Sequence, residues 1–221
     1  MSIYLIRERF DMEDYLTVKG ESIREIVVKK SRFIAYCFHI ESVDVAEDKI
    51  KRIQKLNYKA AHNTFAYAVN PTGDIFKYSD DGEPSLTAGK PIYESIVGRN
   101  LTNVLVVVTR YFGGIKLGTG GLVRAYGQAA QEALDEMEIV KMQYNAVFEI
   151  STDYSLLGML QNYFSTFDCV MEGIEYADEV KIKICIPFRQ KEQFISGHRE
   201  LTNGKQKLYS GGEKFIEKIA F

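Results

Sequence analysis

The spacing of apolar and polar positions predicts two parts of the chain with different element orders. In the first part, apolar runs that alternate with polar positions predict strands, and apolar residues three or four positions apart predict helices. The strands are expected at 15–18, 21–28, 31–40, 64–69, 75–78 and 101–109, and the helices at 43–57, 91–99 and from 119 onward. Residues 79–90 are too polar and too rich in breakers for either element, so we expect a long loop there. Long ordered loops in compact domains are often functional.

From about residue 139 the pattern changes to six elements in the order strand, helix, strand, strand, helix, strand. Their expected ranges are 141–151, 153–167, 169–176, 179–187, 190–201 and 205–219. This βαββαβ order is that of the ferredoxin-like split sandwich. We therefore predict an α+β protein with a first domain at residues 1–138 and a ferredoxin-like domain at residues 139–221.

Residues 110–127, RYFGGIKLGTGGLVRAYG, are the most distinctive stretch of the chain. They follow the expected buried strand and include the start of the helix that begins at Thr119. Five closely spaced glycines occur here: Gly113, Gly114, Gly118, Gly120 and Gly121. Glycine lets the backbone approach a ligand closely, and the first N–H groups of a helix have no partner inside the helix. Together with the basic and aromatic residues among the glycines, this pattern favours phosphate as the ligand.

The usual nucleotide-binding motifs are absent from this stretch. The Walker A spacing GxxxxGK[ST] does not occur, and the GxGxxG-like run from Gly118 has Val123 where the third glycine would stand. Arg124 lies off the apolar side of the helix, in its first turn, where its charge would add to the helix dipole. The alternative is that the glycines only permit a tight turn and close packing of helix on sheet, and the sequence leaves both interpretations open.

Three carboxylates, Asp80, Asp81 and Glu83, fall within the expected loop. Oxygen ligands of this kind hold Mg²⁺ or Ca²⁺, but the spacing of an EF-hand is missing. Turn and capping chemistry around Gly82 and Pro84 explains the same residues. We therefore predict no metal site.

His62 precedes an expected strand and is a candidate general base, because it lies between two segments that carry motifs. With Asp80, Asp81 and Glu83 it forms the set of candidate catalytic residues. No GxSxG motif and no metal-ligand spacing accompanies them. A hydrogen-bonded structural histidine is the alternative.

Composition narrows the classes of function. The 221 residues are 46% apolar, which is enough for a core, and 28 basic against 30 acidic side chains give a net charge of −2. Nucleic acid would therefore be bound by a local basic surface and not by the charge of the whole chain. Three widely spaced cysteines, and no apolar segment typical of a signal peptide or a membrane span, favour a soluble cytoplasmic protein. Because the nucleotide-binding spacings are missing, we expect no cofactor.

Several short motifs together resemble those of the IMPACT family, which is present in bacteria and eukaryotes. They are Lys30-Ser31-Arg32-Phe33, Ala61-His62-Asn63, Asp80-Asp81-Gly82-Glu83-Pro84, Thr87-Ala88-Gly89-Lys90-Pro91 and the stretch from Arg110 to Tyr126. The resemblance covers residues 20–135, and the second domain is similar to the ferredoxin-like domain of bacterial members. Leu86 departs from the pattern, because many members have glycine there.

The resemblance implies a first domain of βαβ type, like the second domain of a small-subunit ribosomal protein. Elongation factor G carries a domain of that fold followed by a ferredoxin-like domain. Eukaryotic relatives interfere, through protein contacts, with activation of the amino-acid-starvation kinase and so act on translational control. These likenesses imply association with RNA or the ribosome, although a fold alone does not determine a function.

Our first hypothesis is a non-catalytic, translation-linked regulatory protein that binds RNA or the ribosome through a Gly-rich basic surface. Arg110, Lys116 and Arg124 would supply charge, glycine N–H groups would approach phosphate, and Tyr111 or Phe112 would stack on bases. The complete set of candidate binding residues is Lys30, Arg32, Lys90, Arg110, Tyr111, Phe112, Gly113, Gly114, Lys116, Gly120, Gly121 and Arg124.

Two alternatives stay open. One is a hydrolase that uses His62 and the acidic cluster on a small phosphorylated or Xaa-Pro peptide substrate. Some bacterial relatives have been labelled proline dipeptidases, but this sequence has neither a dinuclear metal ligand set nor a nucleophile motif. The other alternative is a purely protein-binding regulator. For each of these hypotheses we expect a monomer or a weak homodimer that does not bind a membrane.

Overall fold

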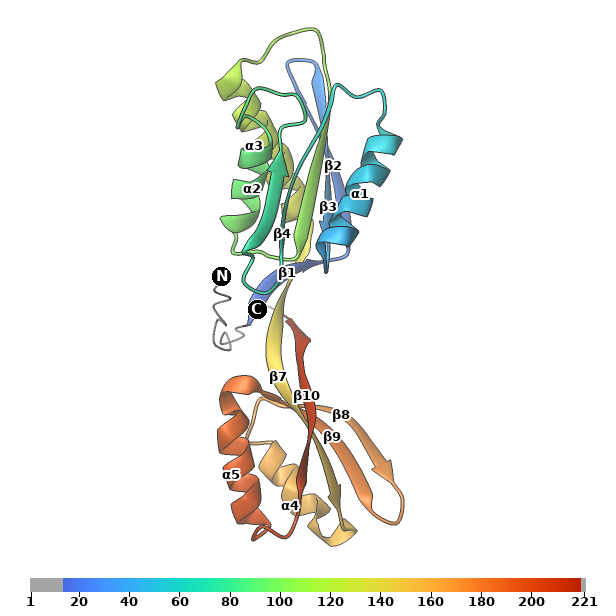
Figure 1. Cartoon of the computed structure of the whole chain (residues 1–221), viewed down its shortest axis with the longest axis vertical. Coiled ribbons are helices and arrows are strands. Elements are labelled where there is room, and N and C mark those ends of the chain that lie inside the picture. The colour runs from blue at the N-terminus through green and yellow to red at the C-terminus, as the bar shows by residue number, and fades with distance from the viewer. Residues whose placement is uncertain (1–13, 220–221) are drawn as a thin grey trace, which may run out of the picture. The chain divides into compact units, whose positions relative to one another are not determined.

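The computed structural model describes residues 14–219, and the chain divides into two compact units (Figure 1). The first unit consists of Met1–Lys141 with Lys218–Phe221, and the second of Met142–Glu217. The predicted division between residues 138 and 139 falls at the start of the strand β7 (Glu138–Thr152), which continues across the observed division. Residues 1–13, where we expect no signal peptide, lie outside the described part.

The first unit contains a five-stranded antiparallel sheet in the order β2-β3-β6-β4-β5. The strands are β2 (Glu21–Val28), β3 (Ser31–His39), β4 (His62–Val69), β5 (Ile75–Ser79) and β6 (Val104–Tyr111). Because β3 and β4 both run antiparallel to β6, they are parallel to each other with β6 between them. The helix that connects β3 to β4 therefore completes a βαβ crossover around the central strand.

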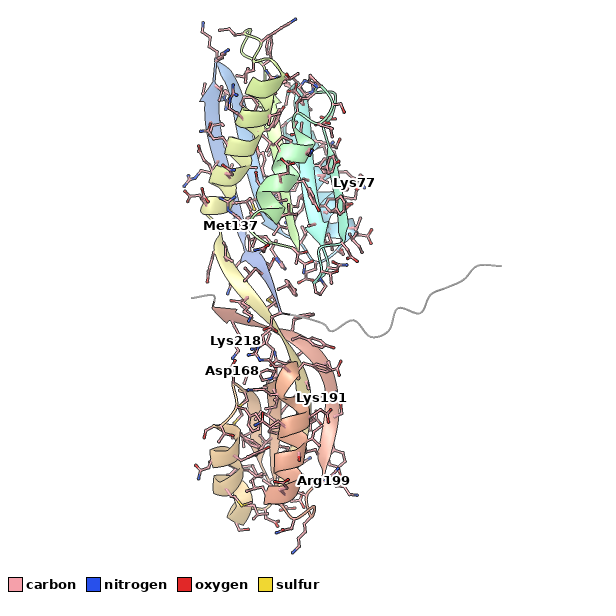
Figure 2. All side chains as sticks on the ribbon, turned by 90° about the vertical axis from the view of Figure 1, so that its left-hand side faces the viewer. Lys77, Met137, Asp168, Lys191, Arg199 and Lys218 are labelled. Atoms are coloured by element: carbon pink, nitrogen blue, oxygen red, sulfur yellow. The ribbon has the colours of Figure 1, made fainter. Side chains whose placement is uncertain are left out.

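Helices cover both faces of this sheet (Figure 1). They are α1 (Val43–Leu56) on one face, and α2 (Gly89–Val97) and α3 (Thr119–Asp135) on the other. The central strand β6 is consequently apolar at every position from Val104 to Val108, since side chains that point to either face are buried. Figure 2 shows Met137, just after α3, at the opposite end of the unit from the loop that precedes this helix.

The predicted elements of the first unit are confirmed, although several of their ends shift; β4, for example, begins at His62 and not at residue 64. Two of the shifts have identifiable reasons. The strand expected from residue 101 begins at Val104, because Asn103 has a left-handed backbone with φ of 56°. Leu101 instead forms an isolated parallel bridge with Leu16. The helix expected from residue 91 begins at Gly89, because a carboxylate from the preceding loop accepts hydrogen bonds from its first amides.

The second unit confirms the predicted βαββαβ order. After β7 come α4 (Tyr154–Phe164), β8 (Val170–Tyr176), β9 (Val180–Pro187), a 3₁₀ turn (Phe188–Gln190), α5 (Lys191–Leu201) and β10 (Leu208–Ile219). The strands of this unit pair in the order β10-β7-β9-β8. The strand β1 (Tyr15–Lys19), which belongs to the first unit, also pairs with β7. The first and third strands of the motif are thus the central ones, as in a ferredoxin-like domain. The α+β prediction is confirmed.

No helix among the described residues is both long enough and apolar enough to cross a lipid bilayer.

His198 is the one histidine of the second unit, and it lies in the apolar core of that unit. Only 1% of the surface of His198 is exposed, and the centroids of its ring and of the Phe194 ring are 6.4 Å apart. Within residues 14–219 its Nε2 atom has no hydrogen-bond partner. Burial lowers the pKa of the imidazole, since a charged ring would lose its hydration without gaining a partner.

We expect the free energy of unfolding to decrease as the pH falls below about 6.5. The unfolded chain then binds a proton that the buried imidazole of His198 binds less readily, so this contribution is complete above the unfolded pKa and is lost toward lower pH. One group contributes at most about 1.4 kcal/mol per pH unit. Urea unfolding of the wild type and of His198→Leu at several pH values measures the effect. A difference between the two proteins that does not change with pH would contradict it.

Candidate functional site

The segments that carry the motifs meet at one end of the first sheet (Figure 1). His62, the first residue of β4, lies opposite Arg110 near the end of β6. Arg32, near the start of β3, lies opposite Tyr111, and Ser79 at the end of β5 lies opposite Phe65. The loop 80–88, the Gly-rich loop 112–118 and the turn at residues 29–30 therefore all lie at this end.

The centre of this region is a buried ion pair between Glu83 and Arg110. The side chain of Glu83 is 4% exposed, and its Oε1 atom accepts a 2.6 Å hydrogen bond from Nη1 of Arg110. The hydroxyl of Tyr126, from α3, donates a 2.7 Å bond to the same oxygen. Burial, and then this bond to the carboxylate, raise the pKa of the Tyr126 phenol. Tyr126 is therefore a permanent donor at neutral pH.

Arg110 is surrounded by aromatic rings as well as by its ionic partner. Its guanidinium carbon lies 5.4 Å from the ring centroid of Phe33 and 5.6 Å from that of Phe112. Nη2 also donates a long, 3.4 Å bond to the hydroxyl of Ser31. The residue is 6% exposed, so its charge is paired inside the unit. The sequence predicts Arg110 as an exposed cation that meets phosphate, and the structure instead gives it an internal, supporting position.

His62 contacts both the ion pair and the acidic loop. Its Nδ1 atom lies 2.7 Å from the carbonyl oxygen of Asp81. A carbonyl oxygen can only accept, so Nδ1 carries the proton, and in the neutral ring Nε2 is the unprotonated nitrogen. Nε2 lies 3.8 Å from Oε1 of Glu83. The histidine is thus held in one orientation by the loop, as a structural, hydrogen-bonded residue would be.

The carboxylates of Asp80 and Asp81 are occupied by backbone amides. Asp80 accepts from the N–H groups of Leu86, Ala88 and Gly89 at 2.8–2.9 Å, and so caps α2 from within the loop. Asp81 accepts a 2.6 Å bond from the N–H group of Asn63. Both acids therefore fix the loop against β4 and α2. No group of three or more histidine, cysteine or acidic residues within 14–219 is arranged to hold a metal ion.

The Gly-rich loop lies directly against the turn between β2 and β3. A Cβ atom on Gly113 would be only 2.1 Å from the carbonyl carbon and oxygen of Lys30, so only glycine fits there. The N–H group of Gly113 donates a 3.1 Å bond to the hydroxyl of Ser31. Gly118, with φ of 73°, then turns the chain into α3. The glycines thus do permit close packing, and the loop and the turn form one continuous surface.

The remaining predicted binding residues are distributed over this end of the unit. Lys30, Lys116, Gly114, Gly120 and Arg124 are exposed. Arg32 is exposed and paired with Glu25, and its guanidinium lies 5.5 Å over the ring of Tyr111.

Three further predicted residues differ in how accessible they are. Tyr111 is half-buried and donates a hydrogen bond to Asn57. Lys90 lies on α2, 3.6 Å from Glu94. Phe112 is 53% exposed.

The sequence prediction assigned no role to Ser31 or Tyr126. Ser31 connects Arg110 to the Gly-rich loop, and Tyr126 completes the hydrogen bonding of Glu83. Both residues belong to the motifs quoted above. However, Tyr126 lies on the apolar side of α3, where the helical pattern indicates an ordinary core residue, and nothing in the pattern distinguishes its hydroxyl.

Comparison with known proteins shows the family to which the chain belongs. Residues 29–134 match the family described as Impact N-terminal domain, and residues 150–205 match the family described as Domain of unknown function (DUF1949). The chain is 37% identical over 207 residues to IMPACT family member YvyE of Bacillus subtilis. The aligned region covers 94% of this chain and 95% of that protein. The chain belongs to the IMPACT family.

Other relatives show how far the likeness extends. An IMPACT family member of Haemophilus influenzae is 35% identical over 88% of this chain and 95% of its own length. The Protein IMPACT homolog of Dictyostelium discoideum is 35% identical over 45% of this chain and 28% of its own length. A solved structure described as "Crystal structure of an hypothetical protein" has a TM-score of 0.60 and 28% identity, and covers 89% of this chain and 96% of that chain.

We expect Arg110→Ala to lower the free energy of unfolding by about 3–5 kcal/mol, because Glu83 would remain as a buried carboxylate without its cation. Thermal and urea unfolding measure this change. Arg32→Ala is the matched control, since its partner Glu25 and Arg32 itself are solvent-exposed, and its cost should stay below about 1 kcal/mol. Equal losses in the two variants would contradict the importance of the buried pair.

We expect Leu86→Gly to stabilise the protein by about 0.5–1 kcal/mol. Leu86 has φ of 61°, in the left-handed region that costs a non-glycine residue about 1–2 kcal/mol, and the greater entropy of glycine in the unfolded chain offsets part of this gain. Leu86→Ala keeps the unfavourable φ and should not stabilise. The prediction is wrong if Leu86→Gly melts at a lower temperature than Leu86→Ala.

Proposed function

We propose that this protein is a cytoplasmic, translation-linked regulator that binds RNA, alone or in the ribosome, through the basic surface around the Gly-rich loop. We define the basic surface as Lys29, Lys30, Lys116 and Arg124 together with the loop 112–118. The contact of Gly113 with Lys30 supports this assignment, because it joins the two lysine-bearing segments into one surface. The four side chains are exposed, and phosphate contacts are made by exposed cations.

The observation that carries the proposal is the difference between the starts of α2 and α3. The first amides of α2 are bound by the carboxylate of Asp80. At the start of α3, by contrast, the N-cap is Gly118, which has no side chain, and no side chain within residues 14–219 caps the helix. Its first turn presents the amide donors of the exposed Thr119 and Gly120 and of the partly exposed Gly121, together with the positive end of the helix dipole, and Arg124 lies beside Gly120.

Arg110 supports this surface without touching the ligand. Its pairing with Glu83 and its contacts with Ser31 and Phe112 fix the residues from which the Gly-rich loop departs. A loop held in this way loses less conformational entropy on binding. Membership of the IMPACT family favours a role in the regulation of translation, because the eukaryotic relatives act on translational control.

The hydrolase alternative has less support from the geometry. Asp80 and Asp81 are hydrogen bonded to backbone amides, and Glu83 is buried beneath Arg110 and Tyr126. These acids hold the loop in place and do not face a substrate. The protein-binding alternative uses the same exposed surface and is separated from RNA binding by experiment.

We expect labelled single-stranded RNA to bind with an affinity that falls as salt is raised, and the double variant Lys116→Ala/Arg124→Ala to bind more weakly. The slope of log affinity against log salt should decrease by about one for each phosphate that the variant no longer binds. Fluorescence anisotropy at several salt concentrations measures both quantities. Lys51→Ala/Lys55→Ala is the matched control, because it removes two exposed cations from α1.

Two results would decide against the proposal. Equal affinities and equal salt slopes for the Lys116→Ala/Arg124→Ala variant and the wild type would show that the basic surface does not contact phosphate. Capture of a partner protein that persists after nuclease treatment, with no binding to purified RNA, would favour the protein-binding regulator.

A further inference from the structure

Phe112 is an exposed aromatic ring with a fixed support behind it. The residue follows directly on β6 and is 53% exposed. The guanidinium of Arg110 lies over the ring, 5.6 Å from its centroid, and makes a cation–π contact. One neighbour of the ring is therefore a charged, planar group.

The support itself cannot move freely. Arg110 is fixed by its 2.6 Å bond to Glu83 and by the ring of Phe33, which lies opposite it in the sheet and is fully buried. Phe33 in turn meets Tyr126 edge-on, with centroids 5.1 Å apart. The hydroxyl of Tyr126 donates a hydrogen bond to Glu83, so the contacts between these four side chains form a closed ring. The orientation of the Phe112 ring is thus set by the buried core of the unit.

The neighbouring aromatic residue is not equivalent. Tyr111 is half-buried, its hydroxyl donates to Asn57, and Arg32 lies over its ring at 5.5 Å. Phe112 has the guanidinium of Arg110 over it, and more than half of its surface meets solvent. Of the two rings, Phe112 is the one with an accessible surface on which a planar group can stack.

The residues that follow Phe112 in the chain belong to the Gly-rich loop of the basic surface. Gly113 and Gly114 follow it directly, and Gly113 packs against the backbone of Lys30. A base stacked on the ring would therefore have its sugar and phosphate beside the exposed Lys30 and the backbone of the Gly-rich loop. Aromatic stacking beside a positively charged backbone track is the usual arrangement in proteins that bind single strands.

We propose that Phe112 is a stacking platform for one unpaired base, and that the basic surface therefore prefers single-stranded to double-stranded RNA. The inference rests on the proposed RNA binding and adds to it the class of RNA. In a duplex the bases are stacked on each other, and the A-form grooves expose only their edges, so no base face is accessible to the ring. A single strand offers such a face without the cost of unpairing.

The first experiment compares three ligands by competition and anisotropy: a short oligouridylate, an RNA duplex of equal length, and uridine monophosphate. Phe112→Ala should weaken binding of the oligouridylate by about fivefold to a hundredfold, which is the range for loss of one base–aromatic stack. Its affinity for the duplex should change less than twofold. Phe112→Leu keeps an apolar side chain without a ring and should behave like Phe112→Ala. Phe76→Ala, at a ring 50% exposed on β5, is the matched control and should bind like the wild type.

The second experiment uses the absence of tryptophan from the sequence. Phe112→Trp introduces a single tryptophan at the proposed platform, so the emission of the protein reports this one position. We expect the variant to keep the affinity of the wild type, and its emission to be quenched by oligouridylate and not by the duplex. Circular dichroism of each variant verifies that the fold is retained.

The outcomes separate this inference from the one on which it rests. If Phe112→Ala and Phe112→Leu bind oligouridylate like the wild type while Lys116→Ala/Arg124→Ala binds it weakly, stacking is wrong and phosphate binding stands. Equal wild-type affinity for single strand and duplex also overturns the preference. Tighter binding of the monophosphate than of the oligouridylate would indicate a free nucleotide as the ligand in place of an RNA strand. No binding of any RNA removes both proposals.

Discussion

A single buried charge determines how one end of the first unit is built. The carboxylate of Glu83 has left water, so it requires a cation and further donors at short range, or it would cost several kilocalories per mole. Arg110 provides the cation from the end of β6, and Tyr126 provides a second donor from α3. The loop 80–88, β6 and α3 therefore cannot take other positions without leaving this charge unpaired. Ser31 extends the same constraint to β3, and His62 joins β4 to the loop 80–88 through its bond to the carbonyl oxygen of Asp81.

This arrangement combines a rigid interior with an open exterior. In the loop 80–88 the side chains of Glu83 and Thr87 are buried, and Asp80 and Asp81 bind amides of the unit itself. The groups on the other side of Arg110 face outward, where the first turn of α3 and the lysines of the basic surface meet solvent. The ion pair of Glu83 and Arg110 is neutral as a whole, whereas Asp80 and Asp81 keep their negative charge, because their hydrogen-bond donors are uncharged amides. The cations of the basic surface must therefore outweigh the field of these two carboxylates at a bound anion. A recognition surface gains affinity when its support is ordered before the ligand arrives.

Most of the fold could be predicted from the sequence, because its elements depend on local periodicity. The continuous apolar run of β6 and the order of the six later elements needed no knowledge of distant residues. The roles of individual polar residues could not be predicted in the same way. Arg110 has the sequence context of an exposed cation, since its burial depends on a glutamate 27 positions earlier in the chain. Capping chemistry is predicted for the acidic loop, but nothing local shows that Asp80 caps α2 across the turn at Leu86.

The cap that Asp80 places on α2 also has a consequence for the order in which the chain folds. Every partner in it lies between residues 80 and 97, and the turn bond from the Thr87 amide to the Pro84 carbonyl belongs to the same segment. Contacts so close in sequence form quickly and cost little chain entropy. During synthesis this segment can form while Arg110 has yet to be added, with the carboxylate of Glu83 still hydrated. The later docking of β6 and α3 is then the step that removes the water around the Glu83 carboxylate. The first unit can therefore fold cooperatively only after the motif at residues 110–126 has been synthesised.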